Sequence, residues 1–137
     1  MKKKYKLGLT NGCFDLLHKG HIFSLKQAKK FCYKLIVLLN SDQSIKKLKG
    51  KSRPIQKQNL RKKKLLNLKY VDEVIIFNST SPLKLIKKIS PNIIFKGSDY
   101  KNKKIIGSEF IRSKGGKVII LKNLKNISTT KLLKKNV

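Results

Sequence analysis

Two histidines stand close together directly after the first apolar segment, within the stretch Thr10-Asn11-Gly12-Cys13-Phe14-Asp15-Leu16-Leu17-His18-Lys19-Gly20-His21. Their spacing of three places both imidazoles on one face of a helical turn, where each ring can donate hydrogen bonds to oxygens that gain charge in phosphoryl-type chemistry. Gly12 and Gly20 let the backbone approach phosphate oxygens, and the N–H groups of a helix start favour an anion. A bare HxxH pair is more often a surface or metal-binding feature. The position after a strand, with a glycine on both sides, favours a polyphosphate site instead.

The elements that must position these histidines follow from alternating short apolar runs and longer basic amphipathic runs. Strands are predicted at 5–10, 35–39, 74–77, 92–95 and 118–121, and helices at 21–32, 54–68, 81–89, 105–113 and 128–133. Residues 43–53 are polar and lysine-rich, so we expect a loop there. This alternation predicts a single α/β domain over residues 1–137, a Rossmann-like doubly wound parallel sheet of about five strands. Ligands of such sheets bind beyond the carboxyl ends of the strands, where the histidines lie.

The composition excludes several classes of protein. The 137 residues include 35 basic and 6 acidic side chains, yet only 3 of the basic ones are arginine. Proteins that read nucleic acid rely on arginine and on interleaved aromatic residues, which make up only 7% here, so a basic nucleic-acid-binding protein is the last alternative. No apolar run approaches the roughly 20 residues that span a bilayer. The two cysteines form no CxxC pair, and the basic start is not a signal peptide. We expect a cytoplasmic protein with neither a specific nucleic acid nor a membrane as partner.

The motifs resemble those of a known family. Gly12-Cys13-Phe14-Asp15 followed by His18-Lys19-Gly20-His21 resembles the GxFD…HxGH signature of the cytidylyltransferase-like nucleotidyltransferases. Ile127-Ser128-Thr129-Thr130 resembles the second signature of that family, a helix start that meets the triphosphate. Other segments fall in register with the branch that makes ADP-heptose: Asn40-Ser41-Asp42, Leu48-Lys49-Gly50, Arg53-Pro54 and Lys96-Gly97-Ser98-Asp99-Tyr100. The resemblance covers residues 5 to 135.

This resemblance implies that the phosphate of a heptose 1-phosphate attacks the α-phosphorus of ATP and releases pyrophosphate, with Mg²⁺ accompanying the ATP. A phosphate nucleophile is already anionic near neutral pH, so the reaction needs no general base. The resemblance further implies a possible homodimer and a separate sugar kinase that supplies the acceptor. The alternative within the same class is a cytidylyltransferase for glycerol 3-phosphate or a related small phosphate.

The resemblance also assigns roles to individual residues. His18, His21 and Lys49 are expected to be catalytic, whereas Asp42 and Lys51 are expected to bind the substrate. No residue is expected to bind a metal directly. Nucleotide binding is expected from Asn11, Gly12, Cys13, Phe14, Gly20, Arg61, Gly97, Asp99, Ser128 and Thr129. The family usually places a glutamate two residues before the arginine that Arg61 matches, and this chain has Asn59 there. Asp15 is expected to order its own turn.

Overall fold

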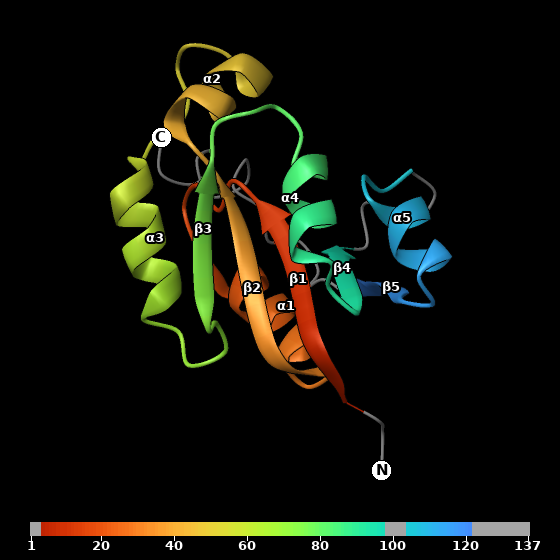
Figure 1. Ribbon diagram of the computed structural model, residues 1–137. Coiled ribbons are helices and arrows are strands. Elements are labelled where there is room, and N and C mark those ends of the chain that lie inside the picture. Colours follow the sequence, from red (N-terminus) through yellow and green to blue (C-terminus); the bar gives the residue numbers. More distant parts are fainter. Residues whose placement is uncertain (1–3, 98–103, 122–137) are drawn as a thin grey trace.

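The computed structural model describes residues 4–97 and 104–121, and these form one parallel sheet with helices on both faces (Figure 1). The strands are β1 (Tyr5–Gly12), β2 (Cys32–Asn40), β3 (Glu73–Phe77), β4 (Ile93–Gly97) and β5 (Lys117–Leu121). The helices are α1 (Lys19–Lys29), α2 (Asp42–Lys49), α3 (Gln58–Leu66), α4 (Leu83–Ile89) and α5 (Ser108–Ser113). The strand order is β3-β2-β1-β4-β5, which confirms the predicted doubly wound α/β fold.

The order of the strands reverses at β1, which creates the crevice in which such folds bind ligands. β1 pairs with β2 over most of its length, from Tyr5↔Cys32 to Gly12↔Leu39. On its other side β1 pairs with β4 only at Gly8↔Ile93 and Leu9↔Ile94. Beyond that point side chains bridge the two strands: the Thr10 hydroxyl donates to the Phe95 carbonyl at 3.2 Å. The two strands are therefore not joined by a backbone ladder at their carboxyl ends.

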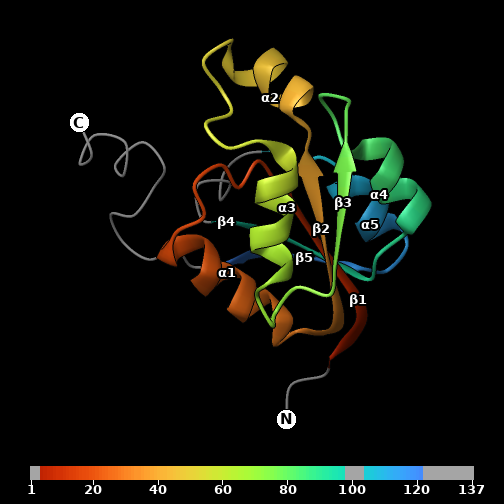
Figure 2. The same cartoon turned by 90° about the vertical axis from the view of Figure 1, so that its left-hand side faces the viewer.

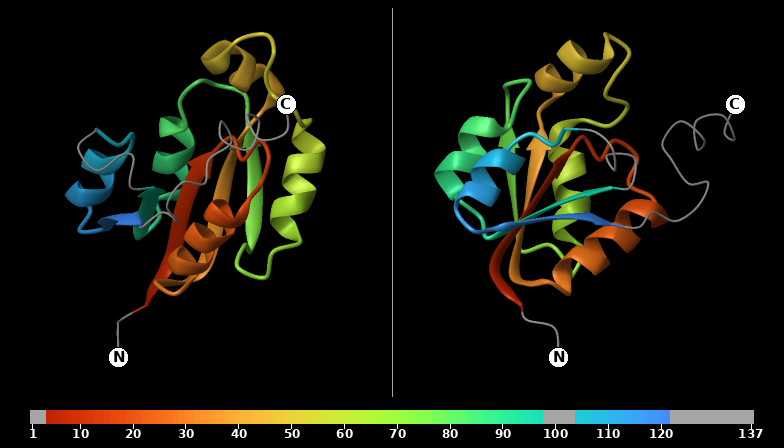
Figure 3. Two further views of the ribbon diagram at one scale, coloured as in Figure 1. Left: turned by 180° about the vertical axis from the view of Figure 1, so that it is seen from behind. Right: turned by 90° about the vertical axis from the view of Figure 1, so that its right-hand side faces the viewer.

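Helices cover the two faces of the sheet in pairs. α1 and α3 pack on one face through Leu25, Ala28 and Leu65, and α4 and α5 pack on the other through Ile86 and Ile111. Figures 2 and 3 show this division from the edges of the sheet and from behind. Residues 35–39 are buried without interruption because alternate side chains enter opposite cores, as expected for a strand covered on both faces. None of the helices in the described part of the chain is long and apolar enough to cross a membrane.

Gly8 lies where side chains of the neighbouring strands approach the backbone of β1 closely. A Cβ atom at this position would lie 2.6 Å from Cys32 Sγ and 2.8 Å from Phe95 Cε2. The central strand must therefore lack a side chain where α1 and the neighbouring strands pack against it.

The predicted loop at 43–53 is wrong for residues 43–49, which belong to α2, whereas residues 50–53 lie in no helix or strand. The Ser41 hydroxyl caps this helix by accepting a hydrogen bond from the Ser44 N–H at 3.1 Å, and Ile45 is buried beneath it. Lysine is a good helix former, so the polar composition did not argue against a helix. α3 begins at Gln58 rather than at Pro54, and α1 ends before Cys32, which belongs to β2. The predicted helix 128–133 lies outside the described residues.

Candidate active site

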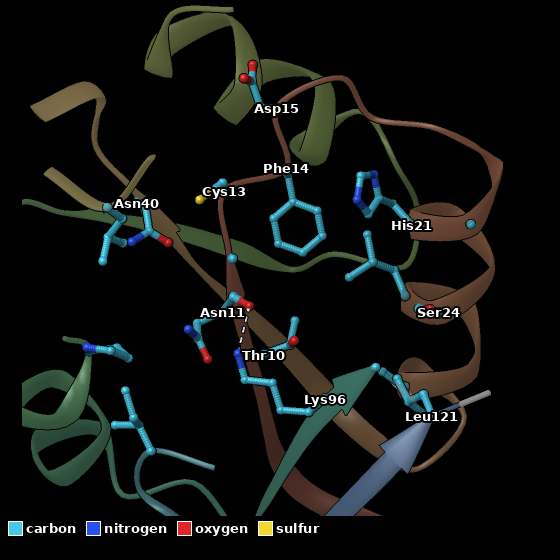
Figure 4. Close-up of a pocket in the computed structure, with 18 of the residues that line it drawn as sticks. Thr10, Asn11, Cys13, Phe14, Asp15, His21, Ser24, Asn40, Lys96 and Leu121 are labelled. Atoms are coloured by element: carbon cyan, nitrogen blue, oxygen red, sulfur yellow. Dashed lines mark hydrogen bonds between the residues drawn. The ribbon is translucent and has the colours of Figure 1, made fainter. Parts of the chain in front are cut away.

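A cleft of about 670 Å³ opens at the carboxyl ends of the strands, between the start of α1, the end of α2 and the segments around α4 and α5 (Figure 4). Its volume suits a small-molecule ligand. The predicted site residues on its wall are Asn11, Gly12, Cys13, Phe14, His18, Gly20, His21, Lys49 and Gly97. Three of the predicted nucleotide-binding residues, Asp99, Ser128 and Thr129, lie outside the described residues.

The two histidines cap the helix that carries them. His18 is the N-cap of α1, and its Nδ1 accepts a hydrogen bond from the Gly20 N–H at 3.0 Å. The Nδ1 atom of His21 accepts from the His18 N–H at 3.2 Å. The two rings stack with their centroids 3.8 Å apart, and Phe14 packs edge-on against His21. A ring nitrogen that accepts a hydrogen bond carries no proton, so in the neutral rings the proton resides on Nε2.

The surroundings favour the neutral form of both rings. Burial, the neighbouring His18 ring and the Lys49 charge lower the pKa of His21 to about 4. Burial also lowers the pKa of His18. Each ring then offers an Nε2–H donor at the first turn of α1, where the helix dipole favours negative charge. The pair can therefore donate to phosphate oxygens while taking up no proton.

The loop between β1 and α1 has a strained backbone conformation, and hydrogen bonds to a distant segment of the chain hold it in place. Phe14 has a φ of 45° and Leu16 a φ of 92°, values that residues with a side chain rarely adopt. The buried Asp15 carboxylate between them accepts hydrogen bonds from the backbone N–H groups of Ile55 and Gln56 and from Arg53 Nε, at 2.8–3.0 Å. These bonds lower the pKa of Asp15 despite its burial. Asp15 therefore anchors a distant segment rather than ordering its own turn.

Arg61 is buried behind the wall of the cleft, with an exposure of 1%. Its Nη1 donates to the carbonyl groups of Cys13 at 2.9 Å and Asn40 at 2.8 Å. Its Nε donates to the Gln56 carbonyl, and its Nη2 donates to Asp42 Oδ1 at 2.8 Å. Arg61 thus joins the ends of β1 and β2 to the start of α2, with Asp42 as its carboxylate partner. Its contact with the nucleotide stays a prediction, one that burial disfavours.

The lysines expected in the site differ in their placement. Lys49 lies on the cleft wall at the end of α2, close enough to His21 for its charge to help lower the pKa of that ring. Lys51 is exposed and is not part of the wall. Asp42 is also absent from the wall because it is bound to Arg61. Substrate binding by Lys51 and Asp42 therefore remains a prediction.

Other wall residues were given no role in the sequence analysis. They include Thr10, Ser24, Asn40, Leu48, Thr80, Pro82, Lys96, Lys104, Ile106 and Leu121. Asn40 and Lys96 directly end strands, which is a usable signal in a parallel sheet. Lys96 donates to the Asn11 carbonyl at 3.4 Å. Thr80 and Ile106 lie in connecting segments with no sequence mark of their own.

The described residues offer little to hold a divalent cation by themselves. Among them no group of three or more histidine, cysteine, aspartate or glutamate side chains could hold a metal ion. The carboxylate that they contribute to the wall is Asp15, and its oxygens are engaged by Arg53 and the 55–56 backbone. This donor set fits an ion that is bound mainly by substrate phosphates, as Mg²⁺ commonly is.

Comparison with known proteins identifies the family to which this chain belongs. The model of the family described as Cytidylyltransferase-like matches residues 9–135. The curated "Bifunctional protein HldE" of Nitrobacter winogradskyi is 47% identical over 130 residues, which cover 95% of this chain and 27% of the relative. The protein of the same name from Caulobacter vibrioides is 47% identical over 128 residues, 93% of this chain and 26% of the relative. The chain thus spans about a quarter of the length of these curated relatives.

Solved structures agree with the fold. The lipopolysaccharide core biosynthesis protein from Thermoplasma volcanium GSS1 has 31% sequence identity and a TM-score of 0.69, over 90% of this chain and 99% of that one. A pantoate-beta-alanine ligase from Francisella tularensis, solved with beta-gamma ATP and beta-alanine, has a TM-score of 0.63 over 99% of this chain and 70% of that one. Its identity of 20% supports a shared fold alone.

Proposed function

Since this chain belongs to the cytidylyltransferase-like family of nucleotidyltransferases, we propose that it transfers AMP from ATP to heptose 1-phosphate and releases pyrophosphate. The observation that carries this proposal is the pair of neutral imidazoles at the start of α1, whose Nδ1 atoms are both engaged in capping. Two Nε2–H donors side by side suit the oxygens of an α-phosphate that gains charge during attack.

The reaction consists of one displacement. A phosphate oxygen of the sugar phosphate forms a bond to the α-phosphorus, and the bond from that phosphorus to the bridging oxygen of the β-phosphate breaks. The electron pair of the broken bond leaves with pyrophosphate, and no proton needs to be moved. Catalysis then consists of positioning and charge stabilisation, which His18, His21 and Lys49 supply. Mg²⁺ bound to the phosphates would neutralise part of their charge.

The identity of the acceptor rests on sequence resemblance. Leu48-Lys49-Gly50 and Lys96-Gly97-Ser98-Asp99-Tyr100 follow the branch that makes ADP-heptose. The similarity to proteins named bifunctional, and to one named for lipopolysaccharide core biosynthesis, supports the same branch. We further propose that a sugar kinase activity outside residues 1–137 supplies the acceptor. The cytoplasmic location and the homodimer are proposed on the same basis.

Pyrophosphate release from a panel of nucleotides and phosphate acceptors tests the proposal. With heptose 1-phosphate, pyrophosphate should form with ATP and much less with CTP. A preference for CTP with glycerol 3-phosphate would overturn the proposed substrates and leave the displacement chemistry intact. A lack of turnover with every pair would overturn the function itself.

A further inference from the structure

The side chain of Asn40 has a fixed orientation that the transfer chemistry does not use. Asn40 ends β2 and is only 5% exposed, yet it lines the cleft, where Figure 4 draws it on the opposite side of Cys13 and Phe14 from His21. Its Nδ2 donates to Ser44 Oγ at 2.9 Å. The Ser44 hydroxyl donates in turn to the Ser79 carbonyl at 2.9 Å. A serine hydroxyl has a single proton, so it must accept from Asn40, and the amide nitrogen must face Ser44.

Because the amide nitrogen faces Ser44, the amide oxygen Oδ1 remains available to a ligand in the cleft. Within residues 4–97 and 104–121, Oδ1 accepts no hydrogen bond, although the Asn40 backbone carbonyl is bound by Arg61. An amide oxygen is purely an acceptor, so it binds an O–H or N–H group and repels a phosphate oxygen. Oδ1 is not among the described buried atoms that lack a partner, so it reaches the open side of the cleft. A ligand that covers this oxygen without offering a donor would leave it unpaired, which is costly and makes Oδ1 a selective contact for a ligand donor.

The position of Asn40 in the cleft indicates which part of a ligand it meets. The Ser44 contact joins Asn40 to α2, whose Leu48 and Lys49 also line the cleft, and to Ser79, which precedes the wall residue Thr80. Gly97, which the resemblance assigns to the nucleotide, ends a strand on the other side of β1, as Leu121 does. A phosphate held by Lys49 and His21 would leave the remainder of the acceptor beside Asn40.

From this arrangement, and resting on the proposed function, we infer that Asn40 is a specificity-determining residue whose Oδ1 accepts a hydrogen bond from one hydroxyl group of the acceptor. Ser44 is the positioning residue that keeps the amide oxygen turned toward the cleft. The acceptor class is therefore a polyhydroxylated phosphate ester with a hydroxyl donor at a fixed place, rather than a bare phosphate.

Kinetics with monodeoxy heptose 1-phosphates test this inference. We expect the wild-type protein to use one of these analogues at least about a hundredfold less efficiently than the parent sugar, because that analogue leaves Oδ1 unpaired. Asn40→Ala should lose at least tenfold in kcat/KM with the parent and almost nothing with that analogue. Its KM for ATP should stay within twofold. Ser44→Ala should reduce the discrimination between the two sugars to an intermediate value.

Asn92→Ala serves as the matched control, because the Asn92 amide oxygen accepts the Leu7 N–H at 3.0 Å and is not part of the cleft wall. It should leave the discrimination unchanged. If Asn40→Ala does not fold, Asn40→Ser and the wild-type analogue series decide the question. Equal losses for the parent and every analogue, or wild-type indifference to all hydroxyl removals, would overturn the inference. If the true acceptor is glycerol 3-phosphate, the proposed function fails, and its deoxy analogues test Asn40 in the same way.

Discussion

Replacement of Arg61 by methionine should destabilise the protein and disturb the histidine loop at the same time. Methionine fills a similar volume but donates no hydrogen bond, so it leaves four acceptors without their donor: Cys13 O, Asn40 O, Gln56 O and Asp42 Oδ1. The Asp42 side chain is 29% exposed and can regain water. At about 1 kcal/mol for each of the remaining carbonyl groups, the loss is about 3 kcal/mol.

Urea unfolding followed by circular dichroism measures this loss. With a slope of about 2 kcal/mol per molar urea, the midpoint of Arg61→Met should fall by roughly 1.5 M. Arg112→Met is the matched control, since Arg112 is exposed on α5, and its midpoint should stay near that of the wild type. Turnover of folded Arg61→Met should drop as well, by up to about a hundredfold, because the carbonyl of Cys13 is no longer held. A midpoint equal to that of Arg112→Met would refute the reasoning.

Four further outcomes are expected. His21→Ala should lower kcat by about a hundredfold or more with a native-like circular dichroism spectrum, and unchanged turnover would remove His21 from the reaction. The free energy of unfolding should fall by about 2–3 kcal/mol as the pH drops from 6.5 to 4. In this range unfolded His21 binds a proton, whereas the folded ring, with its pKa lowered to about 4, does not. Urea titrations at each pH measure this profile, and His21→Asn should flatten it. Thr129→Ala should raise the KM for ATP more than that for the sugar phosphate, and initial-rate kinetics showing only the reverse would place this residue elsewhere. Gly8→Ala should cost about 1–3 kcal/mol in thermal or urea unfolding, because its Cβ would overlap Cys32 and Phe95.

The fold was predictable because its signals are local. Apolar runs such as 35–39 and 74–77 mark strands, and the regular alternation with helices fixes a parallel sheet. α2 was not predictable in this way, since Ile45 is its one buried apolar anchor and the capping hydroxyl of Ser41 follows directly on a strand. Packing, rather than a periodic pattern, determines that helix.

The histidine pair was also predictable, because its members are near neighbours in the sequence and follow Gly12 and flank Gly20. The contacts that hold the histidine loop in place were not predictable. Asp15 reaches residues 53–56, and Arg61 reaches Cys13 across 48 positions, so neither contact leaves a local pattern. Arg61 precedes Lys62-Lys63-Lys64 and resembles them in charge, yet it is buried while Lys63 is exposed. Only the tertiary structure distinguishes a solvated cation from one that holds a loop.

The central place of β1 has a consequence for the order in which the protein assembles. β2 follows β1 in the chain and pairs with it, and β3 then pairs with β2. The opposite edge of β1 has no partner until β4 is synthesised, roughly 80 residues later. A nascent chain that ends before β4 therefore carries an open, apolar strand edge, the feature that invites pairing with other chains. Most of the cleft wall, including both histidines, precedes β4 in the chain, so folding intermediates should expose the histidine loop before β4 and the residues after it complete the wall.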